Sequence, residues 1–532
     1  MHGRAWLPQR LMARGPFLAW LILPGLLLLP VSALAILGRF DGLYGQDPFA
    51  YYNYAVGPLR ENLLHLRPPP PFFWPPGYPL FVTFASFVVG ATPLAGQLVS
   101  LLMGALTPVL TALMARELLP CLSVTETAQS GEGGEERLSS HIPLLAGLLV
   151  ALTPQLWQSS LVVMSDATGL AAATLGAWAL ARYGRGGKPG WLVLAGAALA
   201  WAAITRWIYG LVAALCATYA LALLAAHARL RQGRLAVRHG LGAALAAGMI
   251  LFPVLIPALI GLQNASGSAP FAVDLEVYRW SPANALHREF ITADGLLRYR
   301  LPNGLYYALA PLHTFFFTPL LAPFILPGLY VVARRRALAP WLLGVGWAAI
   351  VYGFHAGAPW QNFRFTLAYL PPLAVLAAAG LAEVHRRLSA RPWLERGLAA
   401  VVVIGLGWMV IGGVRLAWGF ISRKNGDLEI VRRVESETPS GGRLLTFGLT
   451  LTFQHYSHLE TLELFHLSGT DLTNLVMEHR PTFLLIDTVN VETQWAGRPP
   501  SENYDWLRAG PGLVTVDRLG SYTLFKVDDL LP

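Results

Sequence analysis

The chain has 532 residues, of which 55% are apolar and only 13% are charged. Soluble globular proteins are about one quarter charged, so this composition excludes an ordinary soluble protein and indicates a polytopic α-helical membrane protein. The formal net charge of +9 does not point to nucleic acid, because membrane proteins gather basic residues in their cytoplasmic loops.

Long uncharged runs recur along the chain and predict about eleven membrane-spanning helices. Each run has roughly 15–25 residues, the length that a hydrocarbon core of about 30 Å requires. The expected spans are residues 16–38, 94–116, 142–158, 168–182, 190–205, 207–226, 240–262, 309–332, 339–354, 366–384 and 397–419. The apolar segment 78–89 is too short to cross, and we expect it as a helix lying on or dipping into the membrane.

Clusters of Arg and Lys set the orientation of these spans. With a cytoplasmic N-terminus, successive inner loops are basic, at residues 182–188, 229–238, 334–336 and 386–391. Counting 78–89 as a span would put these clusters outside, against the inside bias of basic residues. We therefore predict outer loops at 39–93 and 263–308. The Gly-, Glu- and Ser-rich loop 119–141 is expected to be cytoplasmic and disordered.

The part of the chain after residue 420 has a different pattern. Short runs typical of strands begin at Arg443, Thr461, Thr482, Val514 and Tyr522. A helix is expected at 471–480, between the second and third of these runs. Strand, helix and strand in succession indicate a small α/β domain of about 100 residues. We divide the chain into a membrane domain, 1–420, and an α/β domain, 421–532, which eleven spans place outside the cytoplasm.

Ionisable residues are absent from the middle of the expected spans and gather instead at the outer face. Ion-coupled transporters generally need charge near the membrane midplane. Here the candidates are Asp47 in the first outer loop, Asp166 in the second, and Arg206 and Arg364 at outer turns. An arginine at the outer interface offers a planar fork suited to phosphate or carboxylate.

Each candidate also has a simpler explanation. Asp47, before Pro48, and Asp166, after Ser165, fit turns or helix N-caps. Outer arginines fit lipid headgroups. The aromatic residues at 72–78 fit an interfacial belt. The histidines lack metal-ligand spacing, and the sequence has no nucleotide-binding G-x-x-x-x-G-K-S/T, no G-x-S-x-G and no C-x-x-C motif.

Five short motifs carry a family resemblance. They are Q-D-P-F-A-Y-Y at 46–52, W-P-P-G-Y-P-L-F at 74–81, P-Q-L-W-Q-S-S-L-V-V-M-S-D at 154–166, T-R-W at 205–207 and R-F-T-L-A-Y-L-P-P at 364–372. With them the chain resembles the GT-C class of integral-membrane glycosyltransferases, closest to protein mannosyltransferases and aminoarabinose transferases, across about 16–385. The first motif is similar to the acidic D-E-x-x-Y motif of that class, with Asp47 at the Asp position. Pro48 replaces the second acid, which is a departure.

The resemblance implies a sugar donor linked to polyprenyl phosphate. Asp47 would accept the proton of the acceptor hydroxyl as that oxygen attacks the anomeric carbon from the opposite face, inverting it. Because a lipid phosphate leaves without a general acid, one carboxylate suffices, unlike the pair in glycosidases. Nearby tyrosines and an apolar interface would raise the pKa of Asp47. Arg206, Arg364 or an arginine of loop 263–308 would hold the phosphate.

The resemblance also implies a set of substrate-binding residues: Asp166, Tyr51, Tyr52, Arg206, Arg364, Trp74 and Tyr78. Asp166 would bind a divalent cation (Mg or Mn) beside the phosphate, or orient the acceptor. No metal ligand is assigned, because the loss of the acid at Pro48 counts against a metal.

We expect a multi-pass protein of the plasma (inner) membrane that works on the extracytoplasmic face. The acceptor is left open as a glycan, a lipid or a protein, and the α/β domain would cap the site or engage that acceptor. Two alternatives remain at this point. One is a lipid or polysaccharide transporter without catalysis, which would show midspan charges and internal repeats. The other is an envelope assembly protein whose outer domain binds a partner.

Overall fold

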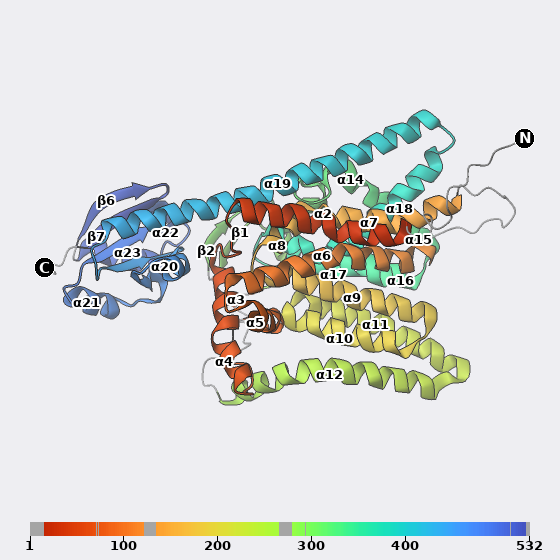
Figure 1. The fold of residues 1–532 in the computed structure, drawn as a ribbon, viewed down its shortest axis with the longest axis horizontal. Helices are drawn as coiled ribbons and strands as arrows, with labels where there is room; N and C mark the ends of the chain where they lie inside the picture. Colours follow the sequence, from red (N-terminus) through yellow and green to blue (C-terminus); the bar gives the residue numbers. More distant parts are fainter. Residues whose placement is uncertain are drawn as a thin grey trace, which may run out of the picture.

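The computed structural model describes residues 15–70, 72, 74–121, 135–264, 279–292, 294–510 and 512–527. Among the predictions above, those for most of loop 119–141, for the middle of loop 263–308 and for Phe73 fall outside these residues. Figure 1 shows a bundle of long helices and a smaller domain of strands and helices. One long helix, α19 (Pro392–Glu437), runs from the bundle into that domain.

The bundle consists mainly of apolar helices, most of them long. These are α2 (Gly15–Leu37), α6 (Pro93–Leu118), α7 (Glu135–Ala151), α8 (Pro154–Leu161), α9 (Ser165–Gly186), α10 (Pro189–Thr205), α11 (Ile208–His227), α12 (Gly233–Asn264), α15 (Ile325–Arg335), α17 (Trp347–Gly357) and α18 (Leu370–Leu388). A helix pairs its own backbone groups, which is what an apolar surrounding demands of a spanning segment.

Shorter helices complete the bundle, and several of them lie at the end nearest the small domain (Figure 1). They are α3 (Gln46–Val56), α4 (Pro58–Leu64), α5 (Gly77–Val89), α13 (Asn303–Leu309), α14 (Thr318–Leu321) and α16 (Leu338–Pro340). Brief 3-10 or π turns of the bundle are η1 (Leu119–Cys121), η2 (Ala228–Gln232), η3 (Pro282–Leu286), η4 (Ala310–Leu312), η5 (Ala322–Phe324), η6 (Trp341–Gly346) and η7 (Phe363–Tyr369), and η8 (Leu464–His466) belongs to the small domain. As expected from its length, the segment 78–89 forms only a short helix, α5.

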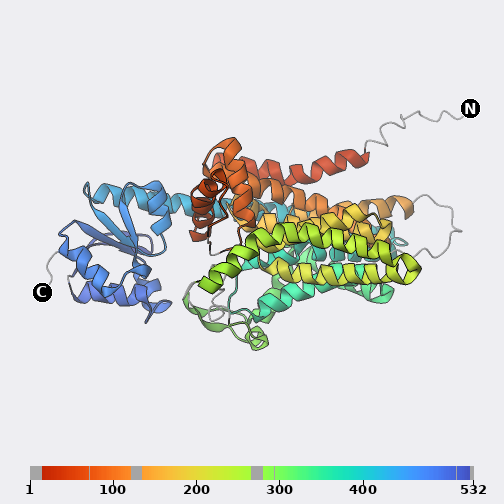
Figure 2. The ribbon, with the colours of Figure 1, turned by 90° about the horizontal axis from the view of Figure 1, so that it is seen from below.

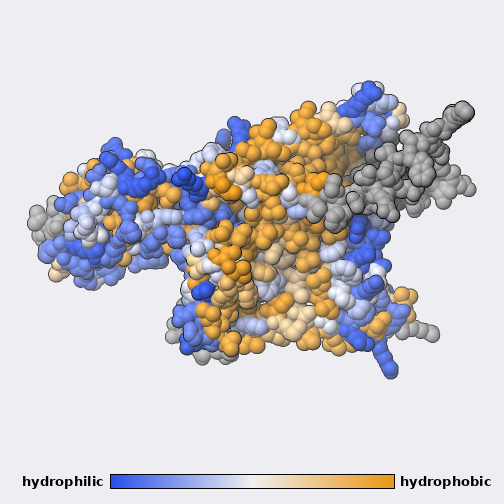
Figure 3. Space-filling model, in the orientation of Figure 1, coloured by the Kyte–Doolittle hydropathy of each residue, from blue (hydrophilic) through white to orange (hydrophobic). Residues whose placement is uncertain are grey.

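Six helices in the described part of the chain are long and apolar enough to cross a membrane. The pair α7 and α8, bent by 55° at the break between them, makes a seventh if it is counted as one span. Figure 3 shows the matching surface, an apolar band with hydrophilic margins on both sides. The chain is therefore a multi-pass helical membrane protein, and the count of eleven spans stays a prediction.

The run 309–332, expected as one span, is not a continuous helix. It is divided into the short segments η4, α14, η5 and the start of α15. Pro311, Pro319 and Pro323 fall inside the run. A proline has no N–H to donate and clashes with the preceding turn, so these residues interrupt the helix that the hydropathy alone predicted.

The expected boundary at residue 420 falls inside α19. The helix does not end with its apolar stretch but continues to Glu437. Val431 and Val434 in its last turns are buried with Leu444, Phe483 and other residues of the small domain. Thus α19 belongs to both parts of the molecule, and its end is part of the core of the second.

The small domain contains a five-stranded sheet with the order β4-β3-β5-β7-β6. Its strands are β3 (Arg443–Thr446), β4 (Glu460–Glu463), β5 (Thr482–Ile486), β6 (Leu513–Leu519) and β7 (Tyr522–Val527). Strand β3 is parallel to β4 and β5, whereas β7 is antiparallel to β5 and β6. The strands β3 and β5 are buried along their whole length, as central parallel strands covered on both faces are.

Helices lie on both sides of this sheet (Figure 2). They are α20 (Thr450–Tyr456), α21 (Gly469–Met477), α22 (Thr488–Thr493) and α23 (Pro499–Ala509), together with the end of α19. The observed strands begin at or within one residue of the expected starts, which are residues 443, 461, 482, 514 and 522.

The small domain also contacts the hairpin of β1 (Glu289–Thr292) and β2 (Gly295–Arg298) at the end of the bundle. The backbone oxygen of Gln494 accepts a hydrogen bond from the N–H of Leu296 at 2.8 Å. Gly295 has a φ of +82°, and a Cβ there would lie 2.1 Å from that same oxygen. Only glycine permits this approach, so Gly295 allows the hairpin to contact the chain directly after α22.

Candidate active site

Asp47 stands in the first turn of α3, directly after the bundle's first long helix and its connecting loop. The N-cap of α3 is Gly45, with a φ of +78° and no side-chain cap. Asp47 is therefore not the capping residue, contrary to the simpler explanation of its position. Its Oδ2 accepts hydrogen bonds from both terminal nitrogens of Arg364, at 3.1 Å each.

Arg364 lies in η7, between α17 and α18. Asn362 opens this turn, and its side-chain oxygen accepts a hydrogen bond from the N–H of Arg364 at 3.0 Å. The guanidinium also reaches a second carboxylate, because its Nε lies 3.6 Å from Oδ2 of Asp166. One arginine thus bridges two acids that come from distant parts of the sequence.

Asp166 lies in the first turn of α9 and is 3% exposed. The N-cap of α9 is Met164 without a side-chain cap, so here too the N-cap explanation does not apply. Oδ1 of Asp166 is ion-paired with Arg206, which ends α10. Within the described residues, Oδ2 of Asp166 and Nε of Arg364 are buried without a hydrogen bond.

These four side chains form a cluster that we call the Asp–Arg cluster: Asp47, Asp166, Arg206 and Arg364. Burial and the nearby charge of Arg364 lower the pKa of Arg206 to about 10, so the guanidinium of Arg206 carries its charge at neutral pH. Both guanidiniums lie over the ring of Phe365, at 5.2 and 5.6 Å from its centroid. Two adjacent guanidiniums with planar donor sets are suited to a phosphate group.

Tyr51 borders the Asp–Arg cluster. Its hydroxyl lies 3.1 Å from Oγ of Ser165, the residue before Asp166. Burial raises the pKa of Tyr51 to about 12, against the opposing effects of Ser165 and Arg206. The hydroxyl is therefore a neutral group that can donate or accept one hydrogen bond at the edge of the cluster.

Trp74 and Tyr78 hold Tyr51 in place. The ring of Tyr51 stacks on Trp74 with centroids 4.9 Å apart, and meets Tyr78 edge-on at 5.4 Å. The hydroxyl of Tyr78 is bonded to Oγ of Ser100, at 2.9 Å, and to the backbone of α6. These two predicted substrate-binding residues therefore contact Tyr51, and through it the cluster.

Tyr52 lies apart from the other predicted site residues and makes its side-chain contacts away from the Asp–Arg cluster. Its hydroxyl donates to the backbone oxygen of Ala91 at 2.9 Å, and its ring meets His455 of α20 edge-on at 5.7 Å. Neighbours in a helix point about 100° apart, so Tyr51 and Tyr52 cannot both face the cluster. The structure places Tyr52 toward the small domain.

Three neighbours of the cluster were not assigned roles from the sequence. Ser165 bonds Tyr51, Phe365 underlies both guanidiniums, and His355 of α17 stacks on Phe365 at 5.1 Å. Ser165 and Phe365 each stand beside a candidate in the motifs 154–166 and 364–372, which is the only signal that the sequence offered for them. Nothing in the sequence singled out His355 for this place.

A metal site does not fit this arrangement. Both carboxylates are already paired with arginines. Among the described residues, no group of three or more His, Cys, Asp or Glu side chains is placed to hold a metal ion. We therefore assign no metal ligand and derive no step through a cation.

Comparisons with protein-family models and with curated proteins find no match. Solved structures do match. The crystal structure of ArnT from Cupriavidus metallidurans bound to undecaprenyl phosphate aligns with a TM-score of 0.61 at 13% identity, covering 97% of this chain and 98% of that one. The apo state of the same protein aligns with a TM-score of 0.59 at 14% identity, covering 94% and 97%. At such low identity these matches establish the fold, over nearly the whole chain.

Proposed function

We propose that this chain, which has the fold of the GT-C class of membrane glycosyltransferases, transfers a sugar from a polyprenyl-phosphate-linked donor to an acceptor. The observation that carries the proposal is the Asp–Arg cluster. It brings one accessible carboxylate and two guanidiniums together at the end of an apolar bundle. The matching ArnT structure is bound to undecaprenyl phosphate. This supports a lipid phosphate as the donor's leaving group.

Asp47 is the proposed general base. Arg364 donates only to its Oδ2, and within the described residues its Oδ1 makes no hydrogen bond. The side chain of Asp47 is 35% exposed, which supports access of an incoming hydroxyl to this carboxylate. A carboxylate held by one oxygen and open at the other is oriented for proton transfer.

The proposed reaction is a single displacement. The acceptor oxygen forms a bond to the anomeric carbon while its proton passes to Oδ1 of Asp47. The bond from that carbon to the phosphate oxygen breaks, and its electron pair leaves with the polyprenyl phosphate. Attack from the face opposite the leaving group inverts the anomeric centre. Arg206 and Arg364 stabilise the charge that develops on the phosphate, a contribution typical of fixed donors in a water-poor site.

We place the Asp–Arg cluster on the extracytoplasmic face of the plasma membrane, with the N-terminus cytoplasmic. The basic last turns of three helices support this. Arg185 in α9, Arg335 in α15 and Arg387 in α18 stand at helix ends, and α9 and η7–α18 begin at the cluster. Since cytoplasmic ends are the basic ones, the cluster belongs to the other side. The same orientation puts the small domain outside, where it would engage the acceptor.

The test is turnover by the purified full-length protein. Polyprenyl-phosphate-linked sugars are supplied one at a time with an envelope extract as the acceptor source, and released polyprenyl phosphate is measured. We expect release from at least one donor and its loss in Asp47→Asn, with donor binding retained. Glu61→Gln is the matched control, because Glu61 is an exposed acid of the same loop.

Two results would count against the proposal. Release that continues unchanged in Asp47→Asn would remove Asp47 as the base. Movement of the intact donor lipid across vesicles, without release from any donor, would favour the transporter instead.

A further inference from the structure

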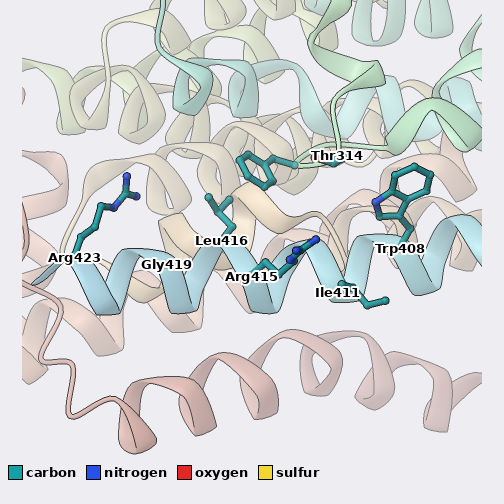
Figure 4. A pocket seen from close by; sticks show the side chains of 9 residues that line it. Thr314, Trp408, Ile411, Arg415, Leu416, Gly419 and Arg423 are labelled. Carbon is teal, nitrogen blue, oxygen red and sulfur yellow. The ribbon is translucent and has the colours of Figure 1, made fainter. Parts of the chain in front are cut away.

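A groove runs along α19 outside the Asp–Arg cluster. It has a volume of about 630 Å³ and is lined by the face of α19 from Trp408 to Arg423 and by Thr314 and Phe315. Figure 4 shows the side chains of Trp408, Leu416 and Arg423 extending from α19 on the side where Thr314 lies. We call it the α19 groove.

Two arginines line the α19 groove at positions eight residues apart, Arg415 and Arg423. Within the described residues, Arg415 makes no ion pair or hydrogen bond, although it stands in a helix that is long and apolar enough to cross a membrane. A charged residue in such a helix is costly and normally has a partner. Arg423 lies over the ring of Phe420 and is electrostatically close to Asp427, so its charge is partly balanced.

Apart from Thr314, the remaining lining is apolar, and part of it is exposed. Trp408 is 41% exposed and Ile411 is 58% exposed. Tryptophan is enriched where an apolar layer meets water. Beyond the groove, α19 continues toward the small domain (Figure 1). Trp408 and Ile411, in the apolar part of the groove, therefore precede its two arginines along the helix.

We propose that the α19 groove binds an anionic phospholipid. Its acyl chains would lie against Trp408 and Ile411, and its phosphate would bind Arg415, with Arg423 contributing from the next turns. A free anion would use the guanidiniums but leave the exposed apolar side chains uncovered. A zwitterionic lipid would cover the apolar side chains, but the cation of its own headgroup already balances its phosphate, so it supplies Arg415 with less counter-charge. An anionic lipid covers the apolar side chains and also supplies a counter-charge for Arg415.

This inference does not require the proposed transfer reaction, although the groove is close to the cluster. Phe315 in the groove wall contacts Phe363 with ring centroids 6.2 Å apart. Phe363 directly precedes Arg364, which pairs with Asp47. Binding is therefore measured without turnover, and we expect Asp47→Asn to bind lipid as the wild type does.

Glycines of α19 allow the groove to be blocked without changing its charge. A Cβ at Gly419 would meet nothing within 4 Å, and the same is true at Gly407, which does not line the groove. Gly419→Leu therefore fills the groove, and Gly407→Leu is its matched control on the same helix. By contrast, a Cβ at Gly412 would lie 2.9 Å from the backbone oxygen of Thr314, so Gly412 is left unchanged.

The experiment is native mass spectrometry of the full-length protein in detergent, titrated with phosphatidylglycerol or with phosphatidylcholine of the same chains. We expect phosphatidylglycerol to bind the wild type at least tenfold more tightly than phosphatidylcholine. Arg415→Gln and Gly419→Leu should each weaken phosphatidylglycerol binding at least tenfold, and Arg423→Gln less. Gly407→Leu and Arg432→Gln, an exposed arginine of the same helix paired with Glu429, should not change it.

Three outcomes would overturn the inference. The first is equal binding of phosphatidylglycerol by all variants. The second is equal binding of the two lipids by the wild type, which would mean apolar contact alone. The third is displacement of phosphatidylglycerol by millimolar inorganic phosphate, which would mean a soluble anion site. If Arg415→Gln fails to fold, judged by its thermal midpoint, Gly419→Leu decides the matter because it keeps every charge.

Discussion

The segment 39–93 contains two aspartates six residues apart, and the structure uses them in different ways. Both oxygens of Asp41 are occupied. Oδ1 accepts from Lys424 and from the N–H of Leu43, and Oδ2 accepts from the hydroxyl of Tyr456 at 2.6 Å. Asp47, in contrast, is bonded through Oδ2 alone. We call the first arrangement the α19 junction, because it joins this segment to α19 and α20.

The two arrangements show how a structural carboxylate differs from a reactive one when both are paired with a cation. In the α19 junction, Lys424 is 3% exposed and donates to both Asp41 and Tyr456. Every partner there is satisfied, as in a buried network that fixes a geometry. In the Asp–Arg cluster, Oδ2 of Asp166 and Nε of Arg364 form an ion pair without a hydrogen bond. Within the described residues, Oδ1 of Asp47 makes no hydrogen bond either, so this cluster is less fully bonded than the α19 junction.

Substitution of the two aspartates should give the largest difference in turnover. Asp47→Asn should lower turnover by about 10²–10⁴-fold, the usual contribution of a positioned general base, with little change in thermal midpoint. Asp41→Asn should do the reverse and lower the midpoint while leaving most of the turnover per folded molecule. Release of polyprenyl phosphate and thermal unfolding of the same preparations measure both. Equal losses of turnover in the two variants would contradict the distinction between a catalytic Asp47 and a structural Asp41.

Asp166→Asn should affect both properties. It leaves Arg206 with its charge in a largely buried place, and removing one partner of such a pair costs roughly 3 kcal/mol of stability. The double variant Asp166→Asn with Arg206→Gln should recover stability, because no charge is left alone, while turnover stays low. Thermal midpoints of the single and double variants test this. A double variant that is no more stable than the single would show that the pair is not the source of the loss.

Tyr456→Phe tests how the small domain is held. It removes a hydroxyl that donates to Asp41 and accepts from Lys424 at 2.8 Å, which should cost about 1 kcal/mol. The loss should appear as faster proteolysis at the α19 junction or faster hydrogen exchange in α20, with turnover reduced less than twofold. Tyr504→Phe, in the core of the small domain, serves as the control away from the junction.

The smallest effect concerns pH. Burial against Phe49 and Tyr52 lowers the pKa of His455 below its ordinary 6.5, and Lys424 adds to the shift while Asp41 opposes it. Below pH 6.5 the unfolded chain therefore binds more protons than the folded one. The contribution of His455 to stability is complete above pH 6.5 and declines as the pH falls toward its folded pKa.

His455→Gln should flatten this part of the pH profile of the thermal midpoint relative to the wild type. His458→Gln, an exposed histidine next to the same helix, should leave the profile unchanged. A wild-type profile that already matches that of His455→Gln would remove the histidine as the cause.

The class of protein and the candidate site residues follow from the amino-acid sequence alone. Apolar runs and the strand patterns after residue 440 depend on neighbours in the chain, because helices and strands are formed by local periodicity. Asp47, Asp166, Arg206 and Arg364 stood out for a similar reason, as charges beside apolar runs. The strand starts at Arg443, Thr482 and Tyr522 were correct to the residue.

Which of these residues meet depends on the folded structure. Arg364 and Asp47 are 317 residues apart, and no local pattern records that they pair. The direction of Tyr52, the division of 309–332 and the continuation of α19 into the small domain each depend on packing against segments far away in the chain. The roles of Asp41 and Asp47 separate for the same reason. A carboxylate's function is set by which of its oxygens the folded chain occupies, and that depends on Lys424, Tyr456 and Arg364, which the fold alone brings to it.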